Sequence, residues 1–304
     1  VQLQNVHDLA SAPLVIKDHY RFAFSPDGIW LATVGTDNSI RLWGMKNLAA
    51  DPVIMVGQDV AISTLVFSPN GNWLAAIGSD NTVRLLNVRS PSEKPIVLDG
   101  YKDTIFDMAF SPDGNWFATS SWDNTIQLRN MTNPSTDPII INYEQVSHLA
   151  FSPDGHWLAT GGEDDTVRLW DLQNPSNEPV SYSYNGNVYT LTFSPDGHWL
   201  AAGGTDSAIY LWNAQNFSED LILLRGHEYY IGSLAFSSDG LWLAYGSNDG
   251  TARLWDMQNL SLAPIILHGQ NSGVYVVAFS ADGSFLATSS GGIISLWNLN
   301  SNEL

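Results

Sequence analysis

Histidine and aspartate are the residues of this sequence that come closest to supporting acid–base or metal chemistry. The seven histidines are scattered, and none stands four residues from another, as a His-x-x-x-His metal pair would require. His156 and His198 each occupy an Asp-Gly-His-Trp segment, and His148 stands in an expected strand. His227 and Asp249 are the one pair that suggests proton transfer. We therefore ask which elements would position these two residues.

The acidic residues are numerous, but most of them recur at two repeated turn positions, where turn formation explains them. The first set is Asp27, Asp113, Asp154, Asp196, Asp239 and Asp282, and the second is Asp37, Asp80, Asp123, Asp164, Asp206 and Asp249. Such a regular distribution singles out no pair of carboxylates for hydrolysis. The chain has no cysteine and no Gly-Lys pair, so thiolate sites and phosphate-binding loops of that type are excluded. We predict a protein that is not an enzyme and has no cofactor or metal.

The net charge of the chain limits the classes of partner that it can bind. The formal net charge is -19 with only 12 Lys and Arg, which argues against nucleic acid and against a membrane surface. We expect the arginines that recur in one strand position to serve solubility and packing; they are Arg41, Arg84, Arg168 and Arg253. No apolar run approaches the ~18 residues of a membrane span, and no signal peptide is visible. We predict a cytoplasmic location.

A motif of the form A-F-S-x-D/N-G-x-W recurs along the whole chain. Its phenylalanines are Phe24, Phe67, Phe110, Phe151, Phe193, Phe236 and Phe279. The intervals between them are 43, 43, 41, 42, 43 and 43 residues, which is typical of blades of four strands. We therefore predict a single domain over residues 1–304.

Each repeat reads as four short strands joined by turns. In the third repeat the expected strands cover residues 105–111, 116–119, 125–128 and 138–142, and residues 111–114 form a turn. The first strands carry apolar residues with two positions between the first pair, where strict alternation allows one, and this spacing predicts a β-bulge. The sets are Ile62/Leu65/Phe67, Ile105/Met108/Phe110, Val146/Leu149/Phe151, Val188/Leu191/Phe193, Ile231/Leu234/Phe236 and Val274/Val277/Phe279.

The third-strand segments carry a family resemblance. Residues 164–171 (Asp-Asp-Thr-Val-Arg-Leu-Trp-Asp) and 249–256 (Asp-Gly-Thr-Ala-Arg-Leu-Trp-Asp) resemble the motif of the WD-repeat family, and Arg225-Gly226-His227 resembles its Gly-His element. The resemblance covers essentially the whole chain, and the style of repeat is similar to that of bacterial, especially cyanobacterial, members. It implies an all-β fold, a seven-bladed β-propeller of four-stranded antiparallel blades.

The two ends of the chain bear on how such a ring closes. Residues 13–16 resemble the fourth-strand segment 264–267, and the last repeat ends after its third strand, so we expect the N-terminal strand to complete the seventh blade. Residues 1–5 also resemble the third-strand segment 167–171 and are surplus to seven blades. We expect the chain to be cut from a longer protein, and degeneration of a duplicated repeat is the alternative.

The resemblance also implies a hydrogen-bonded tetrad of His, Ser or Thr, Asp and Trp within a blade. No repeat has all four residues. The tetrad-like residues that we expect to be structural are His227, Asp249 and Trp255 in the sixth repeat, and Thr160, Asp164 and Trp170 in the fourth. Tyr245 takes the Ser/Thr position of the sixth repeat, and Asn142 stands near the His position of the fourth. His227 and Asp249 therefore read as a structural pair.

The family generally binds partners on the rim that carries the loops between fourth and first strands and between second and third strands. The bulge residue of each first strand points toward this rim, and aromatic residues are favoured anchors of interfaces. The predicted partner-binding residues are Tyr20, Phe106, Trp122, Glu163, Tyr189, Tyr230 and Tyr275. Packing of these aromatics against adjacent blades is the competing interpretation.

The leading hypothesis is a non-catalytic protein-interaction, sensor or scaffold module that binds a protein or peptide on this rim. The acidic Glu163 and Asp18 favour a neutral to basic partner, and other domains of the same longer chain are candidate partners. A propeller that binds carbohydrate or another small ligand is the alternative, because aromatic platforms also stack on sugars. A hydrolase with a site at the channel mouth is less favoured.

Overall fold

The computed structural model describes residues 2–3, 14–15, 19–47, 50–55, 60–175, 177–217, 221–268, 273–280, 282–290 and 293–299. The chain divides into two compact units. Unit one comprises Val1–Asp123 and Leu128–Pro138, and unit two comprises Asn124–Gln127 and Ile139–Leu304. Each unit is described by itself, and the expected single domain over residues 1–304 stays a prediction.

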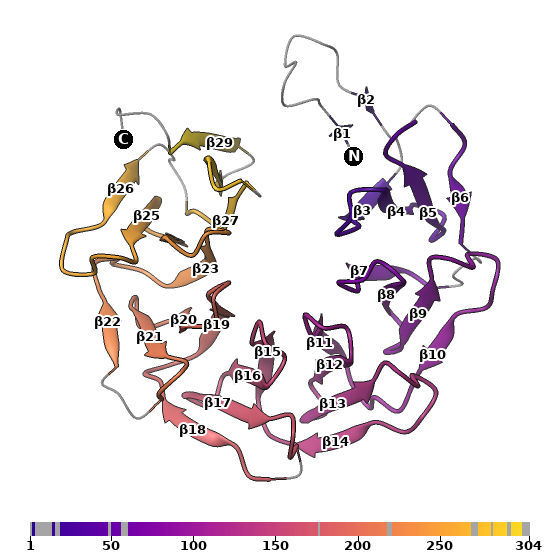
Figure 1. The fold of residues 1–304 in the computed structure, drawn as a ribbon, viewed down its shortest axis with the longest axis horizontal. Coiled ribbons are helices and arrows are strands. Elements are labelled where there is room, and N and C mark those ends of the chain that lie inside the picture. Colours follow the sequence, from indigo (N-terminus) through magenta and orange to yellow (C-terminus); the bar gives the residue numbers. More distant parts are fainter. Residues whose placement is uncertain are drawn as a thin grey trace. The chain divides into compact units, whose positions relative to one another are not determined.

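Unit one contains two complete four-stranded sheets, and the strands of each lie side by side in chain order (Figure 1). The first sheet consists of β3 (His19–Phe24), β4 (Trp30–Gly35), β5 (Ile40–Gly44) and β6 (Val53–Ile54). The second consists of β7 (Ile62–Phe67), β8 (Trp73–Gly78), β9 (Val83–Asn87) and β10 (Ile96–Leu98). The strands of the third sheet are β11 (Ile105–Phe110) and β12 (Trp116–Ser121), which belong to unit one, β13 (Thr125–Asn130), which is divided between the units, and β14 (Ile139–Asn142), which belongs to unit two.

Unit two continues the pattern with four more sheets. The fourth sheet has β15 (Val146–Phe151), β16 (Trp157–Gly162), β17 (Thr166–Asp171) and β18 (Val180–Ser183). The fifth has β19 (Val188–Phe193), β20 (Trp199–Gly204), β21 (Ile209–Asn213) and β22 (Ile222–Leu224). The sixth has β23 (Ile231–Phe236), β24 (Trp242–Ser247), β25 (Thr251–Asp256) and β26 (Ile265–His268). The seventh has three strands within the described residues, β27 (Val276–Phe279), β28 (Phe285–Ser290) and β29 (Ile293–Asn298).

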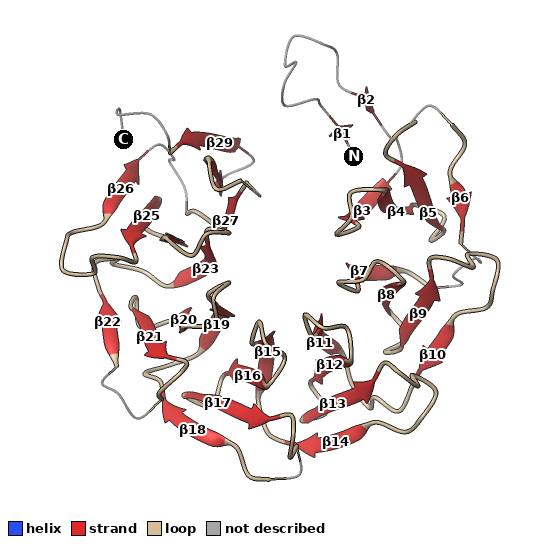
Figure 2. Cartoon of the chain, viewed as in Figure 1, coloured by secondary structure: helices blue, strands red, loops and turns tan. Residues whose placement is uncertain are grey.

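The described part of the chain is built of strands and turns without a helix (Figure 2). Neighbouring strands within a sheet run antiparallel, as in β19 to β22. The predicted fold class, all-β with seven blades of antiparallel strands, is confirmed. In the third repeat, β12 and β13 run two residues longer than expected, to Ser121 and Asn130, whereas β11 ends one residue earlier than expected and β14 begins one residue later.

The N-terminal residues that the structure describes form a separate pair. β1 (Gln2–Leu3) pairs antiparallel with β2 (Leu14–Val15) as a two-stranded sheet. The remaining residues of the two N-terminal segments singled out in the sequence lie outside the described part. Completion of the seventh blade by the N-terminal strand therefore stays a prediction.

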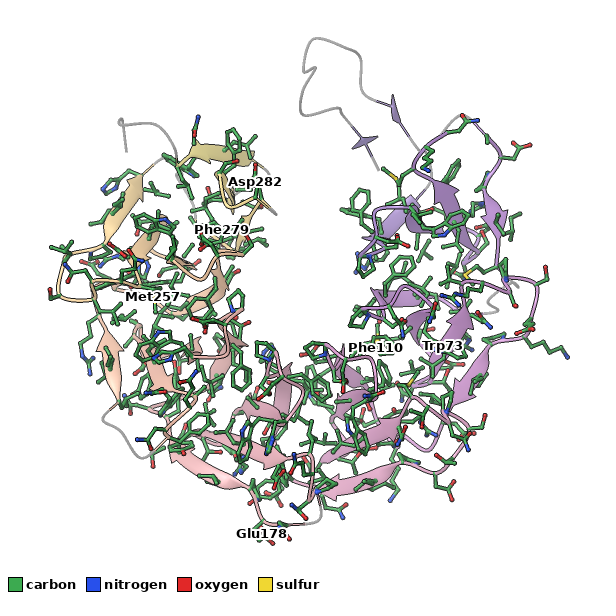
Figure 3. All side chains as sticks on the ribbon, viewed as in Figure 1. Trp73, Phe110, Glu178, Met257, Phe279 and Asp282 are labelled. Carbon is green, nitrogen blue, oxygen red and sulfur yellow. The ribbon has the colours of Figure 1, made fainter. Side chains whose placement is uncertain are left out.

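One turn design joins the first two strands of every blade. In the first blade, Ser25 Oγ donates to Asp27 Oδ1 at 2.5 Å and accepts the backbone N–H of Trp30 at 2.9 Å. Asp27 Oδ1 also accepts the N–H of Ile29 at 2.9 Å, and Gly28 adopts a φ of +68°, which favours glycine. The seventh blade has the same bonds: Ser280 Oγ donates to Asp282 Oδ1 and accepts the N–H of Phe285 (Asp282 is labelled in Figure 3). Turn chemistry thus accounts for the first set of repeated aspartates.

Apolar cores lie between neighbouring blades within each unit. In unit one, Phe110 of β11 belongs to a buried cluster with residues of the second blade, and the half-buried Trp73 of β8 packs against it (Figure 3). In unit two, Trp157 and Trp199 pack in the same way against clusters that join the fourth blade to the fifth and the fifth to the sixth. The recurring second-strand tryptophans therefore serve packing, as expected from their repetition.

Candidate functional site

The predicted bulges set the positions of the candidate site. Register shifts in the first strands skip Phe106 in β11 and Tyr189 in β19, and equivalent shifts occur in β3, β7, β15 and β23. A bulged residue has no partner opposite it, so its side chain can be re-aimed. In the seventh blade the regular pairing begins at Val276, just after Tyr275. The bulge prediction is confirmed in the first six blades.

Phe106 and Trp122 form an exposed aromatic pair in unit one, which we call patch one. Their ring centroids are 4.8 Å apart at an interplanar angle of 71°, an edge-to-face arrangement. The backbone N–H of Trp122 donates to Thr104 O at 2.9 Å, which ties the end of β12 to the start of β11. Phe106 is 40% exposed and Trp122 is 61% exposed.

Tyr189 and Tyr230 form a second aromatic pair in unit two, which we call patch two. Their centroids are 5.8 Å apart and their rings are nearly perpendicular, at 89°. Tyr189 is the bulge residue of β19 and is exposed, whereas Tyr230 precedes β23 and is half-buried. Tyr230 O accepts the N–H of Asn248 at 3.2 Å, which ties the loop that carries Tyr230 to the end of β24.

Tyr275 and Glu163, the other predicted partner-binding residues with described side chains, have no ring contact or side-chain hydrogen bond with either patch among the described residues. Tyr275 is half exposed, and its N–H donates to Ser289 O at 2.9 Å. Glu163 is exposed, and its N–H donates to Gln145 O at 2.9 Å. Tyr20 lies in β3, but its side chain falls outside the described residues, as does Asp18.

Aromatic and small residues alternate at the bulge position along the chain. In order, the seven positions hold Tyr20, Ser63, Phe106, Ser147, Tyr189, Gly232 and Tyr275. Gly232 lies next to Tyr230 in space, because a Cβ built on it would stand 3.8 Å from Tyr230 Cε2. The blades next to those of Phe106, Tyr189 and Tyr275 thus have serine or glycine at the bulge position, whose small side chains leave room for the aromatic ring.

His227 and Asp249 meet inside the sixth blade. His227 Nδ1 donates to Asp249 Oδ2 at 2.5 Å, and its Nε2 is buried without a hydrogen-bond partner among the described residues. Burial lowers the pKa of His227 below its usual value of 6.5 and outweighs the opposing effect of Asp249. The side chain of His227 is fully buried, so a substrate has no access to it. This arrangement suits a structural contact better than proton transfer.

Tyr245 divides the expected tetrad of the sixth blade into two pairs. Trp255 Nε1 donates to Tyr245 Oη at 2.7 Å, and the His227 ring packs edge-on against the Tyr245 ring at 5.0 Å. Burial raises the pKa of Tyr245 to about 12, so its hydroxyl stays protonated. The indole N–H is therefore satisfied by tyrosine instead of serine or threonine.

The fourth blade contains the expected Thr–Trp contact. Trp170 Nε1 donates to Thr160 Oγ1 at 3.0 Å in the buried interior. Asp164 forms an ion pair with Arg168, whose guanidinium lies 4.1 Å above the ring of Tyr143. Asn142, which the sequence placed near the histidine position, is exposed, and the next residue, Tyr143, packs against Trp170 with ring centroids 5.1 Å apart.

Tyrosine fills the histidine position in other blades too, which the sequence reasoning missed. Tyr101 Oη shares a hydrogen bond of 2.8 Å with Thr119 Oγ1, and Tyr184 Oη donates to Asp206 Oδ1 at 3.0 Å. The signal was present in the sequence, because Gly100-Tyr101 precedes its strand by the same spacing as Gly226-His227.

The repeated arginines were also underestimated. Arg41 pairs with Asp37 at 2.6 Å, and Arg84 pairs with Asp80 at 2.7 Å. The hydrogen bond from Arg84 lowers the pKa of Asp80 to about 2. Arg168 pairs with Asp164 in the same way, whereas Arg253 donates to Gly226 O, so three of the four repeated arginines form an ion pair with the turn aspartate four residues earlier.

The turn histidines have local contacts. His156 Nε2 lies 3.4 Å from Asp171 Oδ1, and the rings of His156 and His198 pack against Trp157 and Trp199. His148 is half-buried, and burial lowers its pKa. Within the described residues no group of three or more His, Cys, Asp or Glu could hold a metal ion. No helix of the described part is long and apolar enough to cross a membrane.

Comparison with known families agrees with the geometry. The pattern of the family described as WD domain, G-beta repeat matches residues 14–44, 52–87, 92–130, 140–171, 179–213, 218–256 and 264–298. These matches cover more than half of the chain, and the chain therefore belongs to the WD40 repeat family. No curated protein matches the chain. WD40 repeats generally mediate protein–protein interaction or scaffolding and are typically non-catalytic.

Proposed function

We propose that this chain is a non-catalytic interaction or scaffold module that binds a protein or peptide through patch one and patch two. The observation that carries the proposal is the exposure of three rings in two edge-to-face aromatic pairs, each of which contains one bulge residue. Phe106, Trp122 and Tyr189 are 40%, 61% and 37% exposed, so the competing interpretation, packing against adjacent blades, does not account for their surface. Rigid exposed aromatics are favoured interface anchors because they bury much area at little entropic cost.

Charge supports the choice of partner. The net charge of -19 and the exposed Glu163 favour a neutral to basic protein segment and disfavour nucleic acid and anionic membranes. Candidate partners include other domains of the same longer chain. The cytoplasmic location, the sensor role and the bacterial kinship stay sequence-based predictions.

A comparison of three baits tests the proposal. The first bait is the native chain, and the second carries Phe106→Ala, Tyr189→Ala and Tyr230→Ala. The third is a matched control with three exposed aliphatic residues of fourth strands removed: Val97→Ala, Leu223→Ala and Ile266→Ala. All three must first melt at similar temperatures. Each is then used to capture proteins from lysate of the source cells.

The proposal predicts a protein that the native and control baits retain and the aromatic variant loses. Equal retention by all three baits would move the binding site elsewhere. Retention of no protein would contradict the proposal, and a glycan array would then test the alternative, because exposed aromatic rings also stack on sugars.

A further inference from the structure

Patch one has an acidic residue, Asp103, in the loop beside its exposed rings. This loop is fixed against the end of β12, because Ser121 Oγ donates to Asp103 O at 3.1 Å and the N–H of Trp122 donates to Thr104 O at 2.9 Å. The side chain of Asp103 is exposed, and its Oδ1 accepts the N–H of Thr104 at 2.7 Å. The backbone contacts therefore place an exposed aspartate next to the aromatic pair.

The charges around the pair favour a cation. The Asp123 carboxylate is engaged in this loop, because its Oδ2 accepts the backbone N–H of Lys102 at 2.8 Å. The exposed Asp103 and the net charge of -19 favour a cation over an anion beside the rings. A cation above an indole ring is attracted to the ring face, and more strongly where water is excluded. A planar guanidinium suits both the ring face and a carboxylate.

The interior of the chain contains an arginine that contacts an aromatic ring and a carboxylate at the same time. In unit two, the Arg168 guanidinium lies 4.1 Å above the Tyr143 ring while it pairs with the carboxylate of Asp164. Aromatic ring, arginine and aspartate thus form one stable group in this fold. Patch one offers the aromatic and acidic parts of that group on the surface, where a partner would supply the arginine.

We propose that patch one recognises an arginine side chain of a peptide segment, with the guanidinium over Trp122 and beside Asp103. This inference rests on the proposed function and adds the chemistry of the partner to it. Trp122 is the more exposed ring of the pair, and Phe106 supports it edge-on. A neutral side chain of the same shape would stack but would gain no attraction from the carboxylates.

Selection of peptides from a random phage-displayed library tests the inference. The native chain is the bait, and the Trp122→Ala variant, with a matching melting temperature, removes peptides that bind elsewhere. Retained peptides are then synthesised with each arginine replaced by citrulline, which has a similar shape without the charge. We expect citrulline to weaken binding about tenfold, because a desolvated cation–π contact with a carboxylate is worth more than ~1 kcal/mol.

Two variants of the chain complete the test. Asp103→Asn should weaken the arginine peptide severalfold, whereas Asp137→Asn, an exposed aspartate of the same unit, should leave binding unchanged. Peptides that depend on Trp122 but tolerate citrulline would overturn the arginine inference and leave the proposed function standing. Recovery of no peptide that depends on Trp122 would overturn the inference and count against binding at patch one altogether.

Discussion

At the scale of single residues, the blades satisfy their buried polar groups in more than one way. Trp170 donates to Thr160, whereas Trp255 donates to Tyr245. A buried tyrosine supplies both a hydroxyl and a large apolar ring, so it replaces the usual small residue and fills its surroundings. The identity of each residue in the tetrad therefore matters less than satisfaction of the indole N–H.

The Thr160–Trp170 contact gives a direct test at this scale. Thr160→Val keeps the side-chain shape but removes the acceptor of a buried N–H, so we expect the free energy of unfolding to fall by about 1–3 kcal/mol. Chemical denaturation measures this change. Thr64→Val, at an exposed threonine of β7, should change stability by less than ~0.5 kcal/mol. Equal effects of the two variants would show that the buried bond contributes nothing.

The His227–Asp249 pair predicts a dependence of stability on pH. Because burial lowers the pKa of His227 in the folded chain, the unfolded chain binds more protons below pH ~6.5, and acidification through this range destabilises the fold. His227→Gln should be less stable than the native chain at pH 7.5, and the difference should narrow at pH 5.5. Thermal melts at both pH values measure it. A difference that stays constant or widens on acidification would contradict the lowered pKa, and the exposed His268→Gln serves as control.

At the scale of elements, the repeated turn fixes where each second strand begins. Gly28 adopts a φ of +68°, and a Cβ there would meet nothing within 4 Å, so the cost of substitution is purely conformational. Gly28→Ala should lower the free energy of unfolding by about 1 kcal/mol. Gly28→Asn should cost less, because asparagine tolerates positive φ. Urea denaturation distinguishes the two, and an alanine variant as stable as the native chain would be the contrary result.

Local elements could be predicted from the sequence because their signals are local. The Ser-x-Asp-Gly turns and the bulge before Leu65 or Met108 follow from residue types a few positions apart, and the structure has both. The tyrosines at the histidine position were missed because they lie in connecting segments of unequal length. Tyr101 stands four residues before its strand but Tyr143 only three. Their partners come from other strands, which a linear motif does not show.

For the candidate site, too, the sequence predicted the residues but not their arrangement in space. The bulge pattern predicted which aromatics leave the strand register, and Phe106 and Tyr189 do so. The pairing of Phe106 with Trp122 and of Tyr189 with Tyr230 depends on side-chain direction across two loops. The sequence therefore predicted the members of both patches but not how the rings face one another.

At the scale of the whole molecule, the open question is cooperativity. The chain divides into two compact units, whereas the regular repeat predicts a single domain. A single domain should unfold in one calorimetric transition, with a calorimetric enthalpy equal to the van't Hoff enthalpy. Two resolved transitions, or a calorimetric enthalpy well above the van't Hoff value, would show that the units unfold separately.

The central claim is that exposed aromatic pairs bind a protein or peptide partner. The most direct measurement is the dissociation constant of a captured partner, determined by titration calorimetry for the native chain, the Trp122→Ala variant and the Val97→Ala variant. The account predicts a loss of at least about tenfold for Trp122→Ala, because truncation of a central aromatic anchor costs ~2 kcal/mol or more. Val97→Ala, which shortens an exposed apolar side chain outside the patches, should bind as the native chain does. Native affinity in the Trp122→Ala variant would contradict the claim that patch one binds this partner.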